Sequence, residues 1–167
     1  MNKTFKNISG EVILGTQYPY VLEELISNAE KSISIMLFYI SYNPNNERSP
    51  VNRLVNLLIE AKKRGVEVTV IMDKDKDEDV YNSRTINLPT YEILKKNKIN
   101  VYFDREERVT HSKIVVIDKS IVVIGSHNWT AASFNYYDDT SVKINSAEAG
   151  EYYSDYIHAH IKDSQKS

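Results

Sequence analysis

The chain contains no cysteine, which excludes disulfide bonds and thiolate metal sites and leaves no sign of an oxidising compartment. No apolar run approaches the roughly 20 residues that span a bilayer, and residues 1–10 have no apolar core of signal-peptide length. An excess of one charge is also missing, because 21 Lys and Arg residues stand against 23 Asp and Glu residues. We therefore expect a cytoplasmic protein without stable membrane association, in which charge acts only locally.

The composition that remains is that of an ordinary globular domain. Of the 167 residues, 41% are hydrophobic and 26% are charged, so the chain is long enough to bury a substantial core. No segment has the composition of a linker. We expect a single domain over residues 1–167.

Predicted strands and helices alternate along the chain. Apolar strand patterns cover 11–14, 33–40, 66–72, 99–103 and 140–144, and helical patterns cover 19–31, 50–65, 89–97 and 147–161. Strands separated by helices indicate an α/β fold, and a hairpin over 114–124 makes its sheet mixed rather than purely parallel. We expect a mixed β-sheet flanked by helices on both faces.

A polar stretch at 73–85 contains aspartates at alternate positions, as a calcium-binding loop would. Glu78, however, stands where the sharp turn of such a loop needs glycine, and Arg84 stands where a bidentate glutamate closes it. The pattern therefore favours a solvated acidic loop over a metal site. The aspartates concerned are Asp73, Asp75, Asp77 and Asp79.

Polar side chains gather in the stretch 111–128, HSKIVVIDKSIVVIGSHN. Strand alternation sends His111 and Lys113 to one side, so that imidazole and ammonium point toward one small anion. The apolar run 114–117 predicts a buried central strand, and 118–120 turns the chain into a second strand that Gly125 and Ser126 close. Residues 130–133 can open a short helix, whose first N–H groups favour an anion. The pattern predicts a phosphate site.

This stretch resembles the signature of the phospholipase D superfamily, H-x-K-x4-D-x6-G-S-x-N. All six defining positions are occupied without a gap, by His111, Lys113, Asp118, Gly125, Ser126 and Asn128. Agreement at six positions, each met by chance about one time in twenty, is not expected in a chain of this length. The resemblance implies a phospholipase D-like fold and phosphodiester cleavage that needs neither a metal nor a cofactor.

The resemblance also implies a role for each residue. His111 is similar to the nucleophile that attacks phosphorus and forms a phosphohistidine. Lys113, Asn128 and Ser126 are similar to the groups that hold the nonbridging phosphate oxygens. Asp118 and Gly125 are expected to be structural. In relatives a glutamate about eleven residues beyond the asparagine orients the histidine, and here Asp139 stands in its place.

The mechanism of the superfamily needs two histidines, and this chain has only one H-x-K. Its four histidines are His111, His127 inside the signature, and His158 and His160 near the C-terminus, which we expect to be exposed on different faces of a helix. None of the last three lies in a second copy of the motif. We therefore predict a homodimer in which His111 of each subunit faces the other across a two-fold axis.

Two further groups near the signature are candidates for substrate contact. Arg105 and Arg108 precede His111, and either a contact with the nucleic-acid backbone or a plain surface loop explains them. Tyr136 and Tyr137 follow the signature, where a core edge or a dimer surface is the first interpretation and base stacking the alternative.

Short relatives that carry one motif and act as dimers are largely nucleases, whereas lipid-cleaving relatives usually carry two motifs in one long chain. The sequence therefore predicts a metal-independent endonuclease that cleaves DNA or RNA through a phosphohistidine. Two alternatives remain open. One is a phospholipase D-type lipid phosphodiesterase, and the other is a weakly active nucleic-acid-binding subunit.

Overall fold

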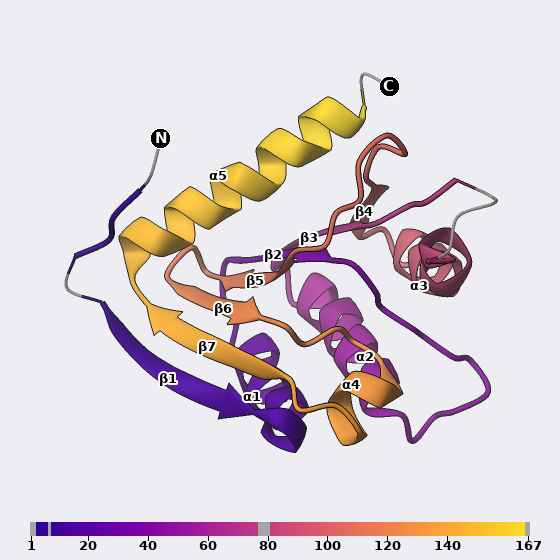
Figure 1. Ribbon diagram of the computed structural model, residues 1–167, viewed down its shortest axis with the longest axis horizontal. Coiled ribbons are helices and arrows are strands. Elements are labelled where there is room, and N and C mark those ends of the chain that lie inside the picture. Colours follow the sequence, from indigo (N-terminus) through magenta and orange to yellow (C-terminus); the bar gives the residue numbers. More distant parts are fainter. Residues whose placement is uncertain (1–2, 7, 77–80, 166–167) are drawn as a thin grey trace.

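The computed structural model describes residues 3–6, 8–76 and 81–165, and in this part of the chain one seven-stranded sheet forms the centre (Figure 1). The strands are β1 Ser9–Leu14, β2 Ser32–Leu37, β3 Glu67–Met72, β4 Asn100–Phe103, β5 Lys113–Ile117, β6 Ile121–Gly125 and β7 Thr140–Asn145. Their order is β1-β7-β6-β5-β2-β3-β4. The pairs β2–β3 and β3–β4 are parallel and all others antiparallel, which confirms the mixed sheet.

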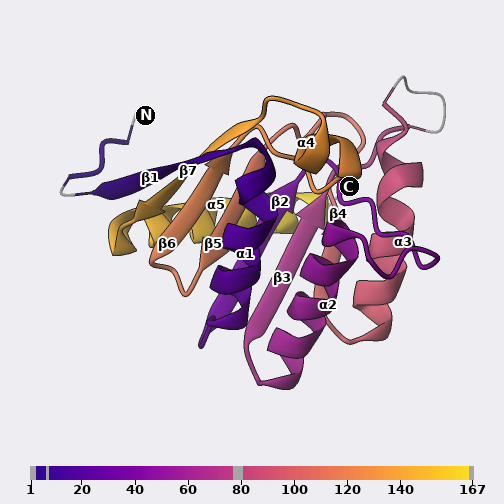
Figure 2. The ribbon, with the colours of Figure 1, turned by 90° about the horizontal axis from the view of Figure 1, so that it is seen from below.

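Helices cover both faces of the sheet, as expected. They are α1 Tyr18–Ser27, α2 Pro50–Lys63, α3 Ser83–Lys96, α4 Ala131–Asn135 and α5 Ala147–Ser164, with a 3-10 turn, η1, at Gly15–Gln17. Figure 2 shows α1 and α2 in front of the sheet and α5 behind it, while α3 lies beside β4. None of the helices in the described residues is both long and apolar enough to cross a bilayer.

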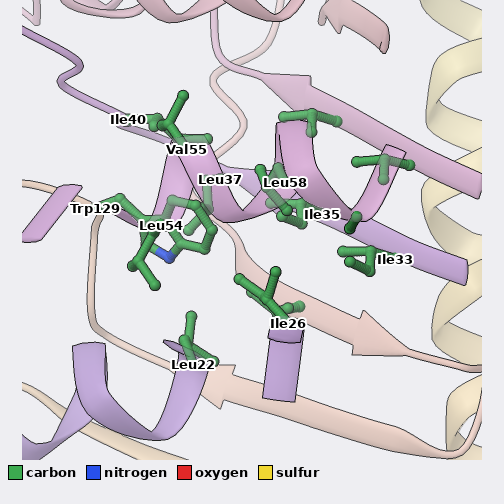
Figure 3. Packing of buried hydrophobic residues seen from close by; sticks show 14 of the residues in the cluster. Leu22, Ile26, Ile33, Ile35, Leu37, Ile40, Leu54, Val55, Leu58 and Trp129 are labelled. Carbon is green, nitrogen blue, oxygen red and sulfur yellow. The ribbon is translucent and has the colours of Figure 1, made fainter. Parts of the chain in front are cut away.

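Side-chain alternation along β2 divides the core into two layers. Ile33, Ile35 and Leu37 pack against α1 and α2 (Figure 3), whereas Met36 belongs to the cluster beneath α5. All five residues of β5 are buried, which confirms the central strand expected from the apolar run. Each buried aliphatic side chain contributes about 2 kcal/mol, so the sheet is held from both sides.

The register of β5 against β2 brings several chain segments to one edge of the sheet. Lys113, the first residue of β5, pairs with Leu37, the last residue of β2. The parallel strands β3 and β4 end at the same edge, and Gly125 at the end of β6 pairs with Ser141 near the start of β7. We call this the carboxyl edge, and α4 lies along it (Figure 2).

The first half of α3 departs from the expectation that this helix begins at Pro89. The helix begins at Ser83, and Pro89 lies inside it. Its inward-facing residues in this half are Ser83, Asn87 and Thr90, all fully buried. A search for apolar residues at helical spacing does not detect such a face, because its buried side chains are polar.

These polar side chains also end β2 earlier than the apolar run 33–40 suggests. The side chain of Asn87 accepts from the Ile40 N–H at 2.8 Å and donates to the Phe38 carbonyl at 2.7 Å. Thr90 Oγ1 accepts from the Tyr42 N–H at 3.2 Å. Because α3 takes these backbone groups, the chain leaves the sheet after Leu37 with its hydrogen bonds satisfied.

The expectation of a solvated acidic loop is wrong for Asp73 and Asp75, which are both buried. Asp75 Oδ1 accepts from the Arg84 N–H in the first turn of α3 at 3.0 Å, and so supplies a partner for an N–H group that the helix itself leaves unpaired. Asp77, Glu78 and Asp79 lie outside the described residues. Among those described, no three His, Asp or Glu side chains are grouped so that they can hold a metal ion.

A close approach between α5 and the β5–β6 turn generates a stability prediction. A Cβ atom on Gly150 would overlap the backbone of Lys119 and Ser120. Gly150→Ala should therefore lower the free energy of unfolding, measured in urea, by about 1–3 kcal/mol. The matched control Glu151→Ala changes an exposed residue of the same helix turn and should stay within about 0.5 kcal/mol. Equal unfolding midpoints for the two variants would contradict the close approach.

Candidate functional site

His111 lies at the carboxyl edge, two residues before β5, with its side chain exposed. Its ring lies 4.9 Å from the ring of Phe38, centroid to centroid. Partial burial and then the nearby Lys113 ammonium lower the pKa of His111, while Asp73 opposes them. The imidazole is therefore mainly neutral near neutral pH, and a neutral ring nitrogen carries the lone pair that a nucleophile needs.

Lys113 is buried next to His111, with 6% of its surface exposed. Its Nζ donates to the His111 carbonyl at 2.7 Å and lies 5.1 Å from the centre of the Phe38 ring. Burial lowers the pKa of Lys113 to about 8, against the opposing charges of Asp139 and Asp73. The group is thus still mostly an ammonium at neutral pH, with two further N–H donors for an anion.

Asn128 is oriented by the backbone that follows β2. Its Oδ1 accepts from the Tyr39 N–H at 3.3 Å. Because that N–H needs an acceptor, the carbonyl oxygen of the amide must face Tyr39 and the NH₂ group takes the other position. Asn128 therefore presents donors, which suit an anionic ligand.

Ser126 and Asp139 form a hydrogen-bonded unit with Ser133. Asp139 accepts from Ser126 Oγ at 2.6 Å through Oδ1 and from Ser133 Oγ at 2.5 Å through Oδ2. Ser126 Oγ in turn accepts from the Thr140 N–H at 3.0 Å. The single hydroxyl proton of Ser126 is therefore given to Asp139, and within the described residues no hydrogen bond joins Asp139 to His111. The predicted contacts of Ser126 with phosphate and of Asp139 with the histidine stay predictions.

Gly125 allows β6 to approach β7 closely. A Cβ atom at this position would overlap the backbone of Thr140 and the Ser141 side chain. Glycine is the residue that leaves room there, and it is followed directly by Ser126 beside Asp139. The geometry agrees with a structural role for Gly125.

Asp118 lies at the opposite edge of the sheet from His111. Its carboxylate accepts from the backbone N–H groups of Glu30, Lys31 and Ser32, at 3.0, 2.7 and 2.9 Å. The backbone of Asp118 and Lys119 has φ of 51° at both positions, which is the geometry of a tight hairpin turn. Asp118 thus joins the β5–β6 turn to the start of β2, which is a structural contact far from the chemistry.

In the part of the chain that the structure describes, the other three histidines each form contacts of their own, and none of these contacts is with His111. His127 is fully buried and stacks on Tyr18 with ring centroids 4.2 Å apart, and its ring nitrogens bond Ser141 Oγ and the Gly15 carbonyl. His160, expected to be exposed, has only 20% of its side chain accessible, because its Nδ1 lies 3.5 Å from Asp104 Oδ2. His158 bonds the Ser154 carbonyl of its own helix.

Three buried residues close to His111 were missed by the sequence analysis: Asp73, Asp104 and Thr110. Asp73 and Asp104 each directly follow the last residue of a parallel strand. A usable signal was therefore present, since ligand-binding and catalytic groups of α/β sheets gather at the carboxyl ends of strands. Thr110, in the loop before β5, carries no comparable signal.

The two arginine candidates lie in the loop between β4 and β5. Arg105 is half-buried and Arg108 is exposed. Tyr136 and Tyr137, at the end of α4, are 83% and 61% exposed and line a hollow of about 450 Å³ together with Asp139. These four residues are accessible near the carboxyl edge, and their contacts with substrate stay predictions.

Comparison with known proteins identifies relatives by sequence. The family model described as "Cardiolipin synthase, PLD-like domain" matches residues 22–161. Phospholipase D of Rickettsia bellii (strain RML369-C) is 30% identical over 96 residues, which are 58% of this chain and 44% of that protein. Mitochondrial cardiolipin hydrolase of Mus musculus is 33% identical over 103 residues, 61% of this chain and 39% of that protein. The matches span less than half the length of these two relatives.

Solved structures show the same fold. A phospholipase D family member, Nuc from Salmonella typhimurium, superposes with a TM-score of 0.75 at 21% identity, over 93% of this chain and 96% of that one. NucT from Helicobacter pylori superposes with a TM-score of 0.66 at 14% identity, over 94% of this chain and 98% of that one.

The contacts of Asp118 generate a test of its structural role. Asp118→Asn should lower the free energy of unfolding by about 2 kcal/mol near pH 7, because an NH₂ group replaces one of the oxygens that face three N–H donors. Burial by itself raises the pKa of Asp118, but the three N–H bonds outweigh burial and hold this pKa below its ordinary value. Its contribution is therefore fully present above the unfolded-state pKa and is lost as the pH falls through the folded-state pKa.

Urea unfolding near pH 7 and at about pH 3 measures both effects, since the difference between the variant and the unmodified protein should shrink in acid. Asp138→Asn, which alters an exposed carboxylate, is the control and should leave stability unchanged at both pH values. A difference for Asp118→Asn that does not depend on pH would contradict a role of its charge.

Proposed function

Because the chain belongs to the cardiolipin synthase, PLD-like domain family, we propose that it is a phosphodiesterase that cleaves DNA or RNA as an endonuclease without a metal. Residues 1–167 form one phospholipase D-like domain in this proposal, and two copies share a site. The observation that carries it is the gathering of His111, Lys113 and Asn128 at the carboxyl edge, around the Phe38–Tyr39 segment.

The reaction proceeds in two displacements at phosphorus. The neutral imidazole of one His111 attacks, an N–P bond forms, and the P–O bond to the leaving oxygen breaks as His111 of the second subunit, the protonated member of this coupled pair, donates its proton to that oxygen. Water then attacks the phosphohistidine and gives its proton to the second imidazole, and the N–P bond breaks. Both histidines return to their starting protonation states.

Lys113 and Asn128 stabilise the charge that builds up on the phosphate oxygens. The ammonium of Lys113 is held against the His111 carbonyl, so its position relative to the nucleophile is set before substrate arrives. The NH₂ group of Asn128 is oriented by the Tyr39 contact. Donors that are fixed in advance do not need to reorganise during the reaction, which makes their stabilisation effective.

The exposed position of His111 supports a shared site. Each chain offers one accessible imidazole at the carboxyl edge, whereas His127 is buried and His160 is bound to Asp104. A two-fold axis close to His111 supplies the second imidazole from an identical surface. The homodimer is therefore part of the proposed mechanism.

Nucleic acid is the preferred substrate for three reasons. Relatives that carry one motif are largely nucleases, and the fold superposes on Nuc, a phospholipase D family member, over 96% of that chain. Arg105 and Arg108 are accessible in the loop that leads to His111, where they can contact a phosphate backbone. Tyr136 and Tyr137 offer exposed aromatic faces beside Asp139, which suits bases that stack.

A lipid phosphodiester is the second candidate, supported by the names of the sequence relatives. These include phospholipase D from several Rickettsia species and a mitochondrial cardiolipin hydrolase. The residues around His111 recognise a phosphodiester in either substrate. The choice between them therefore depends on contacts farther from phosphorus.

The proposal predicts cleavage of nucleic acid in the presence of EDTA. His111→Ala should reduce that cleavage on the order of 10³-fold or more, because the nucleophile is lost. His158→Ala, which removes a histidine whose Nδ1 hydrogen-bonds the Ser154 carbonyl of its own helix, should leave it unchanged. Single-stranded DNA, duplex DNA, RNA and phospholipid vesicles are assayed in parallel. Hydrolysis of vesicle phospholipid without cleavage of nucleic acid would indicate a lipid phosphodiesterase instead of a nuclease. Binding of nucleic acid without cleavage would indicate a nucleic-acid-binding subunit.

Subunit mixing tests the shared site. When unmodified and His111→Ala chains exchange freely, activity should follow the square of the unmodified fraction, so that equal amounts leave about a quarter of the activity. Sedimentation first measures whether the protein is a dimer. A linear loss that leaves a half, or full activity in a monomer, would show that each chain acts alone.

A further inference from the structure

We propose that Asp73 and Asp104 are positioning residues for His111, because together they bind both hydrogen-bond donors of Thr110, the residue directly before it. The backbone N–H of Thr110 donates to Asp73 Oδ1 at 2.5 Å, and its hydroxyl donates to Asp104 Oδ2. This role rests on the proposed function of His111 as nucleophile.

The two carboxylates lie next to each other because of the parallel pairing of β3 and β4. Met72 pairs with Phe103, and the ladder continues one step further with the Asp104 N–H donating to the Met72 carbonyl at 2.8 Å. Asp73 and Asp104 therefore leave adjacent strands side by side. Both are almost fully buried, with 1% and 4% of their surface exposed.

The loop between β4 and β5 needs such an attachment. Its middle residues Glu107, Arg108 and Val109 are exposed, whereas Thr110 is only 5% exposed. On the other side of His111, Lys113 begins β5 and binds the His111 carbonyl. The nucleophile is thus held from both sides, by the two aspartates through Thr110 and by the sheet through Lys113. The rate of a reaction falls when a catalytic group is displaced by about 1 Å, so the attachment of Thr110 is expected to affect catalysis.

Other contacts hold each aspartate in turn. Asp73 Oδ2 accepts from Ser83 Oγ at 2.6 Å, and the Asp73 carbonyl accepts from Asn87 Nδ2 at 3.0 Å, so α3 supports the clamp. Asp104 Oδ1 accepts from the Arg105 N–H at 2.8 Å, and His160 of α5 approaches its Oδ2. Two helices on different sides of the sheet therefore hold the carboxylates that hold Thr110.

Asp73 also acts through its charge. It raises the pKa of His111 and of Lys113, opposing the burial that lowers both. An uncharged residue in its place would keep part of the hydrogen bonding and lose this electrostatic effect. The geometric and the electrostatic role of Asp73 can therefore be separated by experiment.

Two substitutions of Thr110 test the geometric role. Thr110→Val keeps the shape and the N–H but removes the hydroxyl, and it should lower kcat between about 10-fold and 100-fold with little change in KM. Thr110→Ser keeps both donors and should retain the activity. Asp104→Ala should resemble Thr110→Val, and the double variant should be no worse than either single change, because both remove the same bond. Retained kcat in Thr110→Val and Asp104→Ala, with thermal melting that shows both folded, would overturn the clamp.

An NMR titration of the His111 ring tests the role of Asp73 without any activity measurement. Asp73→Asn should shift the titration midpoint of His111 downward, whereas Thr110→Val, which changes no charge, should leave it in place. Asp75→Asn removes a neighbouring buried carboxylate and is the matched control, with a smaller or no shift expected. If the protein cleaves no substrate, the proposed function fails, but this titration still decides the inference. An unchanged midpoint in Asp73→Asn would overturn the electrostatic role of Asp73.

Discussion

The antiparallel pairing of β5 with β2 decides where the candidate chemistry of this protein lies. Leu37 ends β2 and pairs with Lys113, so β5 begins at the edge where the three parallel strands end. His111 therefore comes next to Phe38, and residues from β2, β3, β4, β6 and β7 meet at one edge. If the register of β5 against β2 shifted by one residue, the Lys113 side chain would move from the face covered by α1 and α2 to the face covered by α5. Every apolar side chain of β5 would then point into the wrong layer of the core. The burial of both layers prevents that shift.

Much of this architecture could be predicted from the sequence because the strands are apolar and their turn is short. The hairpin β5–β6, the closing strand β7 and the helix α5 follow from hydrophobic patterns, and the family signature indicates His111, Lys113 and Asn128. The start of α3, the end of β2 and the burial of Asp73 could not be predicted, because they depend on buried polar side chains. Asn87, for example, satisfies backbone groups 47 and 49 residues away in the chain. Patterns of apolar residues carry no information about such bonds.

The signature also leaves the direction of hydrogen bonds undecided. Ser126 and Asp139 are both indicated by the resemblance, but their positions in a motif do not show that Ser126 gives its proton to Asp139 or that Ser133 binds the second oxygen. The carboxylate of the shorter aspartate in place of glutamate is held between the end of β6 and α4 by these two hydroxyls. Its charge still reaches Lys113 and opposes the effect of burial on the pKa of that ammonium. Within one chain, Asp139 thus acts on the cation of the site, and its contact with His111 stays a prediction.

The carboxyl edge is proposed to bind an anion, yet it contains the carboxylates of Asp73, Asp104 and Asp139. The hydrogen bonds that these carboxylates accept explain why their charge is compatible with a bound anion. Asp73, Asp104 and Asp139 each accept at least two hydrogen bonds from backbone N–H or hydroxyl groups, which disperse their negative charge. The buried pair Asp73 and Asp104 is further removed from a ligand that binds at the surface. Without a nearby carboxylate, burial alone would push Lys113 toward its neutral form, in which it neither attracts phosphate nor stabilises the charge of a transition state. Asp139 and Asp73 therefore favour the charged form of the ammonium, while Lys113 and Asn128 present the donors that face the anion.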